Sequence, residues 1–236
     1  MKERPILFSG PMVRAILEGR KTQTRRVVKP QPYVTKTGCV GWGEPWGKRI
    51  PNGPRSAFGG RNVTMQELIG DFCPYGKPGD RLWVRETWGV ATRPDPAQGW
   101  VDGIEYKADE AYIDGSGLLP LRVMEDFNPD VLDKWRGRWC RSIHMPRWAS
   151  RILLEVTDVR VQRVQEISEE DARAEGVTVP AAVLQAAREA TSEYDCVNWS
   201  YVDGFATLWD SINKGRGYGW DVNPWVWAIT FKQIEV

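Results

Sequence analysis

Two runs of positively charged residues that contain no acid are the part of the sequence best suited to chemistry. Residues 20–29 hold five cations, and residues 134–151 hold six cations together with three tryptophans. Cations interleaved with aromatic rings suit a nucleic-acid strand, because cations neutralise phosphates and indoles stack on bases. The alternative is a solvated face balanced by the acidic segment 166–175, and Arg147-Trp148 could equally form a structural lid. The members of the two runs are Arg20, Lys21, Arg25, Arg26 and Lys29, then Lys134, Trp135, Arg136, Arg138, Trp139, Arg141, Arg147, Trp148 and Arg151.

The only histidine of the chain, His144, restricts the metal and nucleophile chemistry. It excludes multi-histidine metal centres, and a Ser-His-Asp triad would depend on this one imidazole. The four cysteines show no CxxC spacing, so a weak zinc combination of Cys39, Cys73, Cys140 and His144 competes with free buried thiols. We therefore expect no metal and no cofactor.

A carboxylate at an apolar position is a further candidate. Leu82, Val84 and Glu86 alternate onto one face of a strand, which should be the buried face. A buried carboxylate needs a partner, for which Arg26 and Arg85 are the candidates. Ion-paired core support is one interpretation, and a pocket carboxylate is the other.

Composition places these residues in a soluble protein that can build a sizeable core. The 236 residues carry 32 Lys and Arg against 31 Asp and Glu, so the net charge of +1 makes adhesion driven by bulk charge unlikely as a function. No apolar run approaches the roughly 20 residues that span a bilayer, and no signal-peptide segment is visible at the N-terminus. We expect a cytoplasmic protein without membrane contact. The 13 Trp, 16 Pro and 23 Gly residues indicate long loops anchored by aromatic residues.

The elements that must position these residues are mainly strands. The pattern 11–18 indicates a helix that begins near Pro11 and is capped by Gly19. A change of phase after Val156 predicts a bulge or a turn at Thr157-Asp158. No regular strand–helix–strand alternation is visible, which favours a small mixed barrel with helices on its rim. The remaining expected strands are 20–28, 81–88, 104–108, 152–156, 159–161 and 225–231, and the remaining expected helices are 168–175, capped by Ser168, 180–192 and 201–212.

Several of these segments resemble the ASCH family of the PUA-like superfamily. Residues 16–25, ILEGRKTQTR, resemble the family signature ILxGxKTxTxR, and 79–84, GDRLWV, resemble its GDxLxV strand. The segments 152–164, 167–176 and 225–235 are similar to later family elements. The resemblance implies an α+β fold with a small PUA-like β-barrel. It also implies a single domain, 1–236, with insertions at about 29–77 and 111–147, as in long members found in phages and prophages.

The resemblance also implies activity on nucleobases. One small bacterial member removes the acyl group from N4-acetylcytidine with a Lys, a Thr and a Glu, which fall here on Lys21, Thr24 and Glu175. The expected substrate is thus an N4-acylated cytosine nucleoside or nucleotide. Other members are described as ribonucleases or RNA binders, so an RNA or modified-DNA binding module, or a ribonuclease, is the alternative. The candidate substrate-binding residues are Arg20, Thr22, Arg26, Glu86, Arg147 and Trp148.

Amide hydrolysis by these residues sets a geometric condition. A threonine hydroxyl needs a base, and Lys21 serves only if burial and the neighbours Arg20 and Arg25 lower its pKa. Glu175 could protonate the departing nitrogen or hold the substrate as an acceptor. In a regular strand, Lys21 and Thr24 point to opposite faces. We therefore expect Lys21 in the loop after Gly19, with the strand beginning near Thr22.

Overall fold

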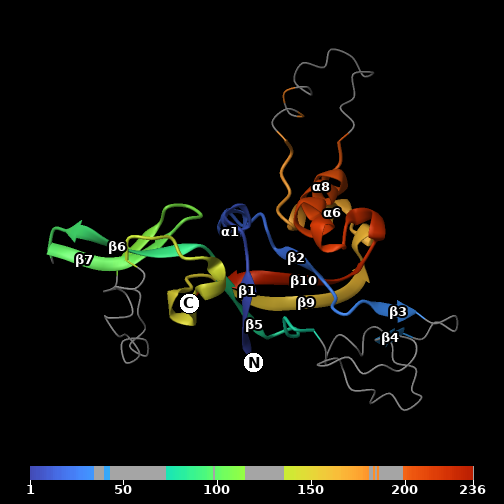
Figure 1. Cartoon of the computed structure of the whole chain (residues 1–236), viewed down its shortest axis with the longest axis horizontal. Coiled ribbons are helices and arrows are strands. Elements are labelled where there is room, and N and C mark those ends of the chain that lie inside the picture. The colour runs from blue at the N-terminus through green and yellow to red at the C-terminus, as the bar shows by residue number, and fades with distance from the viewer. Residues whose placement is uncertain are drawn as a thin grey trace. The chain divides into compact units, whose positions relative to one another are not determined.

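The computed structural model describes residues 1–34, 40–42, 73–97, 99–114, 136–180, 183, 185 and 199–235 (Figure 1). Helices and strands are mixed, as expected for an α+β fold, and the strands of these ranges form open sheets without a closed barrel. The elements are β1 (Glu3–Leu7), α1 (Gly10–Leu17), β2 (Gln23–Val27), β3 (Pro32–Val34), β4 (Val40–Trp42), β5 (Arg81–Arg85), β6 (Trp88–Asp95), β7 (Gly99–Tyr106), β8 (Tyr112–Asp114), β9 (Leu153–Arg163), α6 (Glu169–Ala174), α8 (Tyr201–Asn213) and β10 (Trp225–Ile234). None of the helices in these ranges has the length and hydropathy needed to cross a membrane.

The chain divides into two compact units, each made of segments that are distant in sequence. Unit 1 comprises Met1–Gly19, Gly79–Glu155 and Lys232–Val236, and unit 2 comprises Arg20–Pro78 and Val156–Phe231. The boundaries fall inside β9 and β10, so each of these strands supplies residues to both units.

Unit 1 combines a small mixed sheet with a three-stranded antiparallel sheet. β1 pairs in parallel with β5, and β5 pairs antiparallel with the beginning of β9. The order of the second sheet is β6-β7-β8, in which β6 and β7 form a long hairpin from Trp88↔Tyr106 to Asp95↔Gly99. Figure 1 shows this hairpin as two strands lying side by side. The expected strand 81–88 is thus divided between β5 and β6, and the strand expected at 104–108 begins earlier, at Gly99.

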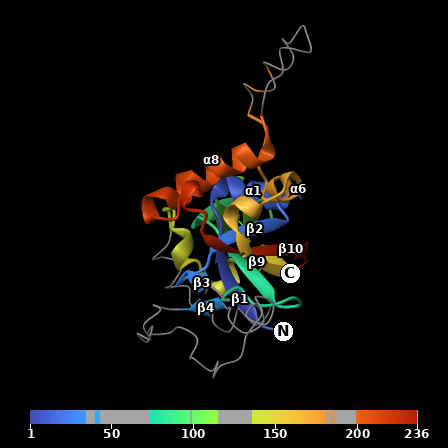
Figure 2. The same cartoon turned by 90° about the vertical axis from the view of Figure 1, so that its right-hand side faces the viewer.

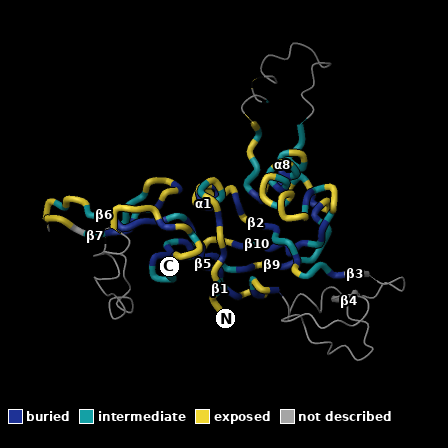
Figure 3. Tube along the Cα trace, in the orientation of Figure 1, coloured by how far each residue is buried: buried dark blue, intermediate teal, exposed yellow. Residues whose placement is uncertain are grey.

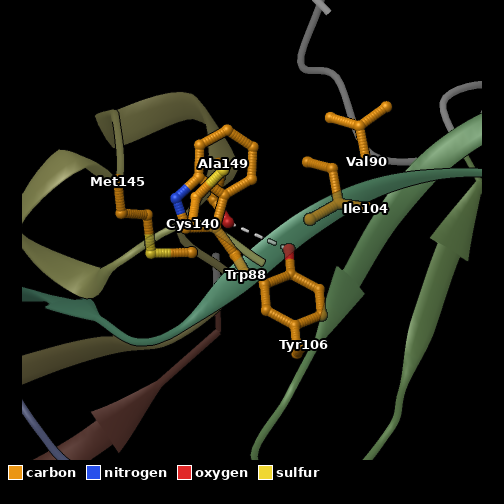
Figure 4. Close-up of a cluster of buried hydrophobic side chains, with 7 residues drawn as sticks. All are labelled: Trp88, Val90, Ile104, Tyr106, Cys140, Met145 and Ala149. Atoms are coloured by element: carbon orange, nitrogen blue, oxygen red, sulfur yellow. Dashed lines mark hydrogen bonds between the residues drawn. The ribbon is translucent and has the colours of Figure 1, made fainter. Parts of the chain in front are cut away.

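One buried hydrophobic cluster of unit 1 combines residues of this hairpin with residues that precede β9. Its buried members include Trp88, Tyr106 and Met145, and the Tyr106 hydroxyl donates to the carbonyl of Ala149 at 2.9 Å (Figure 4). Among the described residues, its buried members are Trp88, Val90, Ile104, Tyr106, Cys140, Met145 and Ala149.

Glu86 is buried in unit 1 as expected, but its expected partners are wrong. Its carboxylate accepts two hydrogen bonds of 3.0 Å from Arg151, whose guanidinium also donates to Asp109 at 2.8 and 2.9 Å. Arg85 instead donates through Nε to the carbonyl of Met145. The reason is register: β5 and β9 pair with Trp83 opposite Leu153, which brings the residues after β5 alongside those before β9. The guanidinium of Arg151 also lies 4.0 Å from the centre of the Tyr106 ring.

Unit 2 places two helices on one face of a sheet with the order β9-β10-β2. β2 and β10 are antiparallel, from Gln23↔Thr230 to Val27↔Val226. Val226 belongs to a buried cluster with Phe205 and Trp209 of α8, and Val27 packs against this cluster. Figures 1 and 2 both show α6 and α8 next to each other. Because side chains alternate along a strand, the side chains of Gln23 and Arg25 share this helix-covered face, and those of Thr24 and Arg26 point to the opposite face.

The expected helix termini are confirmed where the signals are local. α1 is followed by Gly19 at a φ of +72°, and the Ser168 hydroxyl accepts from the amide of Asp171 at the start of α6. β9 runs without interruption through Thr157-Asp158, so of the bulge or turn predicted there, the turn is wrong. These two consecutive residues are both exposed, whereas Val156 and Val159 are buried, and the buried face shifts within the strand. Figure 3 colours β9 and the other elements by burial. Of the helix expected at 180–192, only residues 180, 183 and 185 lie among the described ones.

Candidate active site

The site in unit 2 begins where the chain enters β2. The regular strand starts at Gln23, and Lys21 precedes it as an isolated bridge to Glu175. The intervening Thr22 amide donates to the carbonyl of Ala174 at 2.8 Å, and the Thr22 carbonyl accepts from the amide of Phe231 at 2.8 Å. The expectation that Lys21 lies outside the regular strand is therefore confirmed.

The Lys21 ammonium is buried and fully coordinated by oxygen atoms. Nζ donates at 2.7 Å to Oε2 of Glu175, at 2.7 Å to the backbone carbonyl of Glu175 and at 2.8 Å to the carbonyl of Gln23. An ammonium has three hydrogens, so these three bonds use all of its donors. The exposed fraction of the side chain is 0% for Lys21 and 4% for Glu175, which makes this a buried ion pair.

The short helix α6 positions Glu175. Ser168 caps its N-terminus, and Gly176, at a φ of +84°, follows Glu175 at its C-terminus. An acid in the first turn is favoured there by the helix dipole, and Asp171 occupies that turn. Asp171 and Glu175 are four residues apart and thus share one face of the helical segment. The two carboxylates consequently face β2 together.

Arg25 joins these two carboxylates. Its Nη2 donates to Oδ2 of Asp171 at 2.6 Å, and its Nη1 donates to Oε1 of Glu175 at 3.3 Å. The amide oxygen of Gln23 accepts a further bond of 2.6 Å from Nη1, and Asp171 accepts from Arg160 at 3.2 Å. Charges of alternating sign therefore form a continuous chain, in the order Lys21, Glu175, Arg25, Asp171 and Arg160.

Sequence reasoning missed the roles of Gln23 and Asp171 in this network, and considered Arg25 only as a member of the first basic run and as a neighbour that lowers the pKa of Lys21. By sequence alone, Asp171 is one of several acids that suit a helix N-terminus. The available signal was its spacing of four residues from Glu175, which places the two acids on one helix face. The alternation of Gln23 and Arg25 along β2 was the matching signal on the strand.

Burial governs the protonation of Lys21. Burial lowers the pKa of Lys21 below its ordinary value. The Glu175 carboxylate raises this pKa, and the positive charges of Arg26 and Arg25 lower it further. Arg26 shares the face of Thr24, whereas Arg25 lies on the helix-covered face. The ammonium at the start of β2 therefore interacts with charges on both faces of the sheet.

Thr24 is the expected catalytic residue that these contacts do not include. It is buried, pairs with Ile229 in the β2–β10 ladder and points away from the face that carries Arg25. It is not one of the three acceptors of the Lys21 ammonium described above. The structure thus brings Lys21 and Glu175 together and leaves Thr24 on the other side of the strand.

The face of Thr24 carries polar groups of its own. Burial lowers the pKa of Arg26, and Tyr75 and the Glu175 carboxylate act in the opposite direction. Burial likewise raises the pKa of Tyr75, while Arg26 lowers it. Tyr75 is thus electrostatically coupled to Arg26, and sequence reasoning did not single it out.

The other candidate substrate-binding residues divide between the two units. In unit 2, Arg20 and Thr22 are exposed, and Arg20 donates to the carbonyl of Gly176 at 3.3 Å. Glu86, Arg147 and Trp148 belong to unit 1. There Arg147 donates to Glu3 at 2.8 Å. The Trp148 ring packs edge-on against the Trp88 ring, with 5.7 Å between the ring centroids, next to the buried cluster. Substrate contact by these residues stays a prediction.

The described residues contain no group of three or more His, Cys, Asp or Glu side chains arranged to hold a metal ion. Cys73 lies in unit 2 and Cys140 in unit 1, both as buried thiols. Cys39, the other cysteine of the weak zinc combination, lies outside the described residues.

Comparisons with known proteins add no relative at this point. No protein-family model, no curated protein and no solved structure matches the chain.

Proposed function

We propose that this protein is a metal-independent amidohydrolase that removes the acyl group from N4-acylated cytosine nucleosides or nucleotides. In this proposal the chain is a long ASCH-type protein with a PUA-like core. The observation that carries it is the buried 2.7 Å ion pair between Lys21 and Glu175, which are 154 residues apart in sequence. The family resemblance selects the same two residues independently of their contact.

The ion pair can supply both the base and the acid that amide hydrolysis needs. Transfer of one proton from Nζ to Oε2 leaves a neutral amine on Lys21 and a neutral carboxylic acid on Glu175. Burial favours this transfer, because it disfavours both charged forms. The lowered pKa of Lys21 supports a role as the base.

The proposed reaction has two steps, acylation of Thr24 and hydrolysis of the resulting ester. A water molecule at the beginning of β2 relays the proton of the Thr24 hydroxyl to the Lys21 amine, and the Thr24 oxygen attacks the acyl carbonyl. Glu175 gives its proton to the N4 nitrogen as the carbon–nitrogen bond breaks, which releases cytidine and leaves an acyl ester on Thr24. Water then hydrolyses the ester, with Glu175 as the base that accepts a proton from water and Lys21 as the acid that returns a proton to the Thr24 oxygen. Transfer of the proton from Glu175 to Lys21 restores the ion pair.

The position of Thr24 restricts where the substrate binds. Lys21 and Thr24 flank the first residues of β2 from different sides, so the acyl group has to bind at the beginning of that strand. Arg26, on the face of Thr24, is the candidate to neutralise negative charge that develops on the acyl oxygen.

The test is release of cytidine from N4-acetylcytidine by the purified chain, followed by chromatography. Lys21→Ala, Thr24→Ala and Glu175→Gln should each reduce kcat/KM by about 10²-fold or more, because each removes a proton-transfer or nucleophilic group. Lys29→Ala is the matched control: Lys29 is an exposed lysine of the same basic run and should retain activity. Circular dichroism verifies that each variant is folded.

No turnover by the wild-type chain on N4-acetylcytidine, its monophosphate or a longer acyl analogue would contradict the proposal. Retention of activity in both Lys21→Ala and Glu175→Gln would contradict the assignment of the ion pair.

One observation favours a second candidate, a binding module that recognises a base in RNA or modified DNA at the same site. All three donors of the Lys21 ammonium are already used, which suits a group that maintains the shape of a site. Calorimetry with N4-acetylcytidine distinguishes the two candidates. Binding without turnover favours the module, and turnover favours the enzyme.

A further inference from the structure

The two oxygen atoms of the Glu175 carboxylate bind two different cations. Oε2 accepts from the Lys21 ammonium at 2.7 Å, and Oε1 accepts from Nη1 of Arg25 at 3.3 Å. Arg25 therefore restricts rotation of the carboxylate and keeps Oε2 directed at Lys21. The proposed transfer of a proton from Nζ to Oε2 requires this orientation.

Arg25 is itself held in place by a carboxylate and an amide. Its Nη2 donates to Oδ2 of Asp171 at 2.6 Å, and its Nη1 donates to Oε1 of Gln23 at 2.6 Å. Gln23 is anchored in turn, because its Nε2 donates to Oδ1 of Asp171 at 3.1 Å and to the hydroxyl of Thr230 at 3.2 Å. The guanidinium is thus oriented by a network that spans β2, β10 and α6.

Packing and ion pairing alone do not account for the Arg25 guanidinium. Its side chain is 0% exposed, and its Nε has no hydrogen-bond acceptor among the described residues. A buried donor without a partner costs stability, and apolar side chains often replace buried ion pairs without loss of stability. A guanidinium at this position is better explained by its effect on Glu175.

Arg25 acts on the proposed reaction without touching the substrate. It lies on the helix-covered face of β2, where its Cζ is 5.7 Å from the centre of the uncharged Phe205 ring of α8. Thr24, the proposed nucleophile, points to the opposite face. An influence of Arg25 on acyl transfer must therefore pass through Glu175.

The negative charge of Asp171 determines how strongly Arg25 acts on Glu175. The cation at Oε1 favours the charged carboxylate and opposes the arrival of a proton at Oε2, whereas Asp171 offsets the charge of Arg25. The charged side chains around this carboxylate in the described part of unit 2 include Lys21, Arg25, Arg26, Asp171 and Arg160, with Asp158 next to Arg160.

We propose that Arg25 and Asp171 are positioning residues that set where the proton of the Lys21–Glu175 pair resides. Arg25 orients the Glu175 carboxylate, and Asp171 offsets enough of the charge of Arg25 for a proton to reach Oε2. Their role in catalysis rests on the proposed amidohydrolase activity. Their charge coupling to Lys21 does not, since the buried pair titrates whether or not a substrate is converted.

The pH profile of acyl release from N4-acetylcytidine tests this role, because the two residues carry opposite charges. Arg25→Gln removes a cation and should move the pH optimum of kcat upward by about one unit. Asp171→Asn leaves Arg25 uncompensated and should move the optimum downward by about half a unit. KM should change by less than about twofold in both variants. A purely structural role would lower activity without moving the optimum in opposite directions.

Further variants keep the test decisive if one charge deletion impairs folding. Arg25→Lys keeps the charge but loses the planar fork, so kcat should fall about tenfold at an unchanged optimum. The double variant Arg25→Gln/Asp171→Asn removes both charges and should restore the optimum to within about 0.3 pH unit of the wild type. The controls Arg173→Gln and Glu170→Gln make the same charge changes at exposed positions of α6 and should leave the optimum unchanged.

NMR titration of the Lys21 ε-methylene signal, assigned by its loss in Lys21→Arg, separates charge coupling from turnover. The positive charge of Arg25 lowers the pKa of Lys21. The titration midpoint should therefore rise in Arg25→Gln and fall in Asp171→Asn.

Turnover in which either the pH optimum or the Lys21 midpoint fails to move in these opposite directions overturns this inference alone. No turnover by the wild-type chain at any pH overturns the proposed function and, with it, the catalytic role of both residues. Opposite shifts of the midpoint would then still establish the charge coupling.

Discussion

At the scale of single residues, buried charge dominates unit 2. Lys21 and Arg25 have fully buried side chains and share the carboxylate of Glu175, while Arg25 also binds Asp171. A buried charge is tolerated only when partners replace the lost water, and removal of one partner leaves the others uncompensated. Each member of this network is therefore sensitive to neutral substitution.

Asp171 provides a pH-dependent test of the network. Burial raises the pKa of Asp171, but the charge of Arg25 and the hydrogen bonds from Gln23 and Arg25 outweigh it and lower the pKa below the ordinary 3.8. A carboxyl group whose pKa is lower in the folded state than in the unfolded state stabilises the folded state at pH values above the unfolded-state pKa. This stabilisation is lost as the pH falls through the folded-state pKa. Asp171→Asn should reduce the free energy of unfolding by about 1–3 kcal/mol at pH 7, with a smaller difference below about pH 4.

Urea denaturation between pH 3 and pH 7 measures this difference. Asp158→Asn is the control, because the Asp158 side chain is 54% exposed and pairs with Arg160 at 3.4 Å. It should change the free energy of unfolding by less than about 1 kcal/mol. A difference for Asp171→Asn that does not vary with pH would contradict the assigned direction of the pKa shift.

At the scale of elements, α6 is too short to be stable by itself. It has six residues, and isolated helices below about 12 residues are marginal in water. Its N-cap and its contacts with β2 and α8 therefore maintain the positions of Asp171 and Glu175.

Substitution of the N-cap tests this role of α6. Ser168→Ala removes the hydrogen bond from the amide of Asp171 and should reduce the free energy of unfolding by about 1 kcal/mol. It should also lower kcat/KM for acyl release, because Glu175 moves with the helix. Ser200→Ala removes the equivalent cap of α8, with a bond of 3.0 Å from the amide of Asp203, and should lower stability without loss of activity. Equal activity losses in the two variants would show that α6 has no special role.

At the scale of the whole molecule, two strands pass through both compact units. β9 and β10 each cross a unit boundary without a break. A substitution that destabilises unit 1 should therefore also destabilise unit 2, and we expect both units to unfold in one transition.

Arg151→Met tests this coupling from unit 1. It leaves the Glu86 carboxylate, which is 1% exposed, without its guanidinium and should reduce the free energy of unfolding by about 3–5 kcal/mol. Hydrogen exchange should show lower protection in β2 and α8 as well as in β6. Arg136→Met, which breaks the more exposed pair with Asp102, should cost less than about 1 kcal/mol. Loss of protection restricted to unit 1 would show that the units unfold separately.

The sequence by itself determined the features that depend on neighbouring residues. The cap of α6 by Ser168, the turn at Gly19 and the position of Lys21 before the regular strand all follow from signals within a few residues. Alternation of side chains does not show where strand pairing stops. The sequence therefore did not predict the boundary between β5 and β6 or the unbroken course of β9.

Only the tertiary structure decided which distant groups meet. Glu86 binds Arg151, 65 residues away, because of the β5–β9 register, and Arg25 binds Asp171, 146 residues away, because α6 covers one face of β2. The same packing uses all three donors of Lys21 and leaves Thr24 on the other face. Strand register and helix placement depend on the sum of many weak long-range contacts, and no local pattern in the sequence encodes that sum.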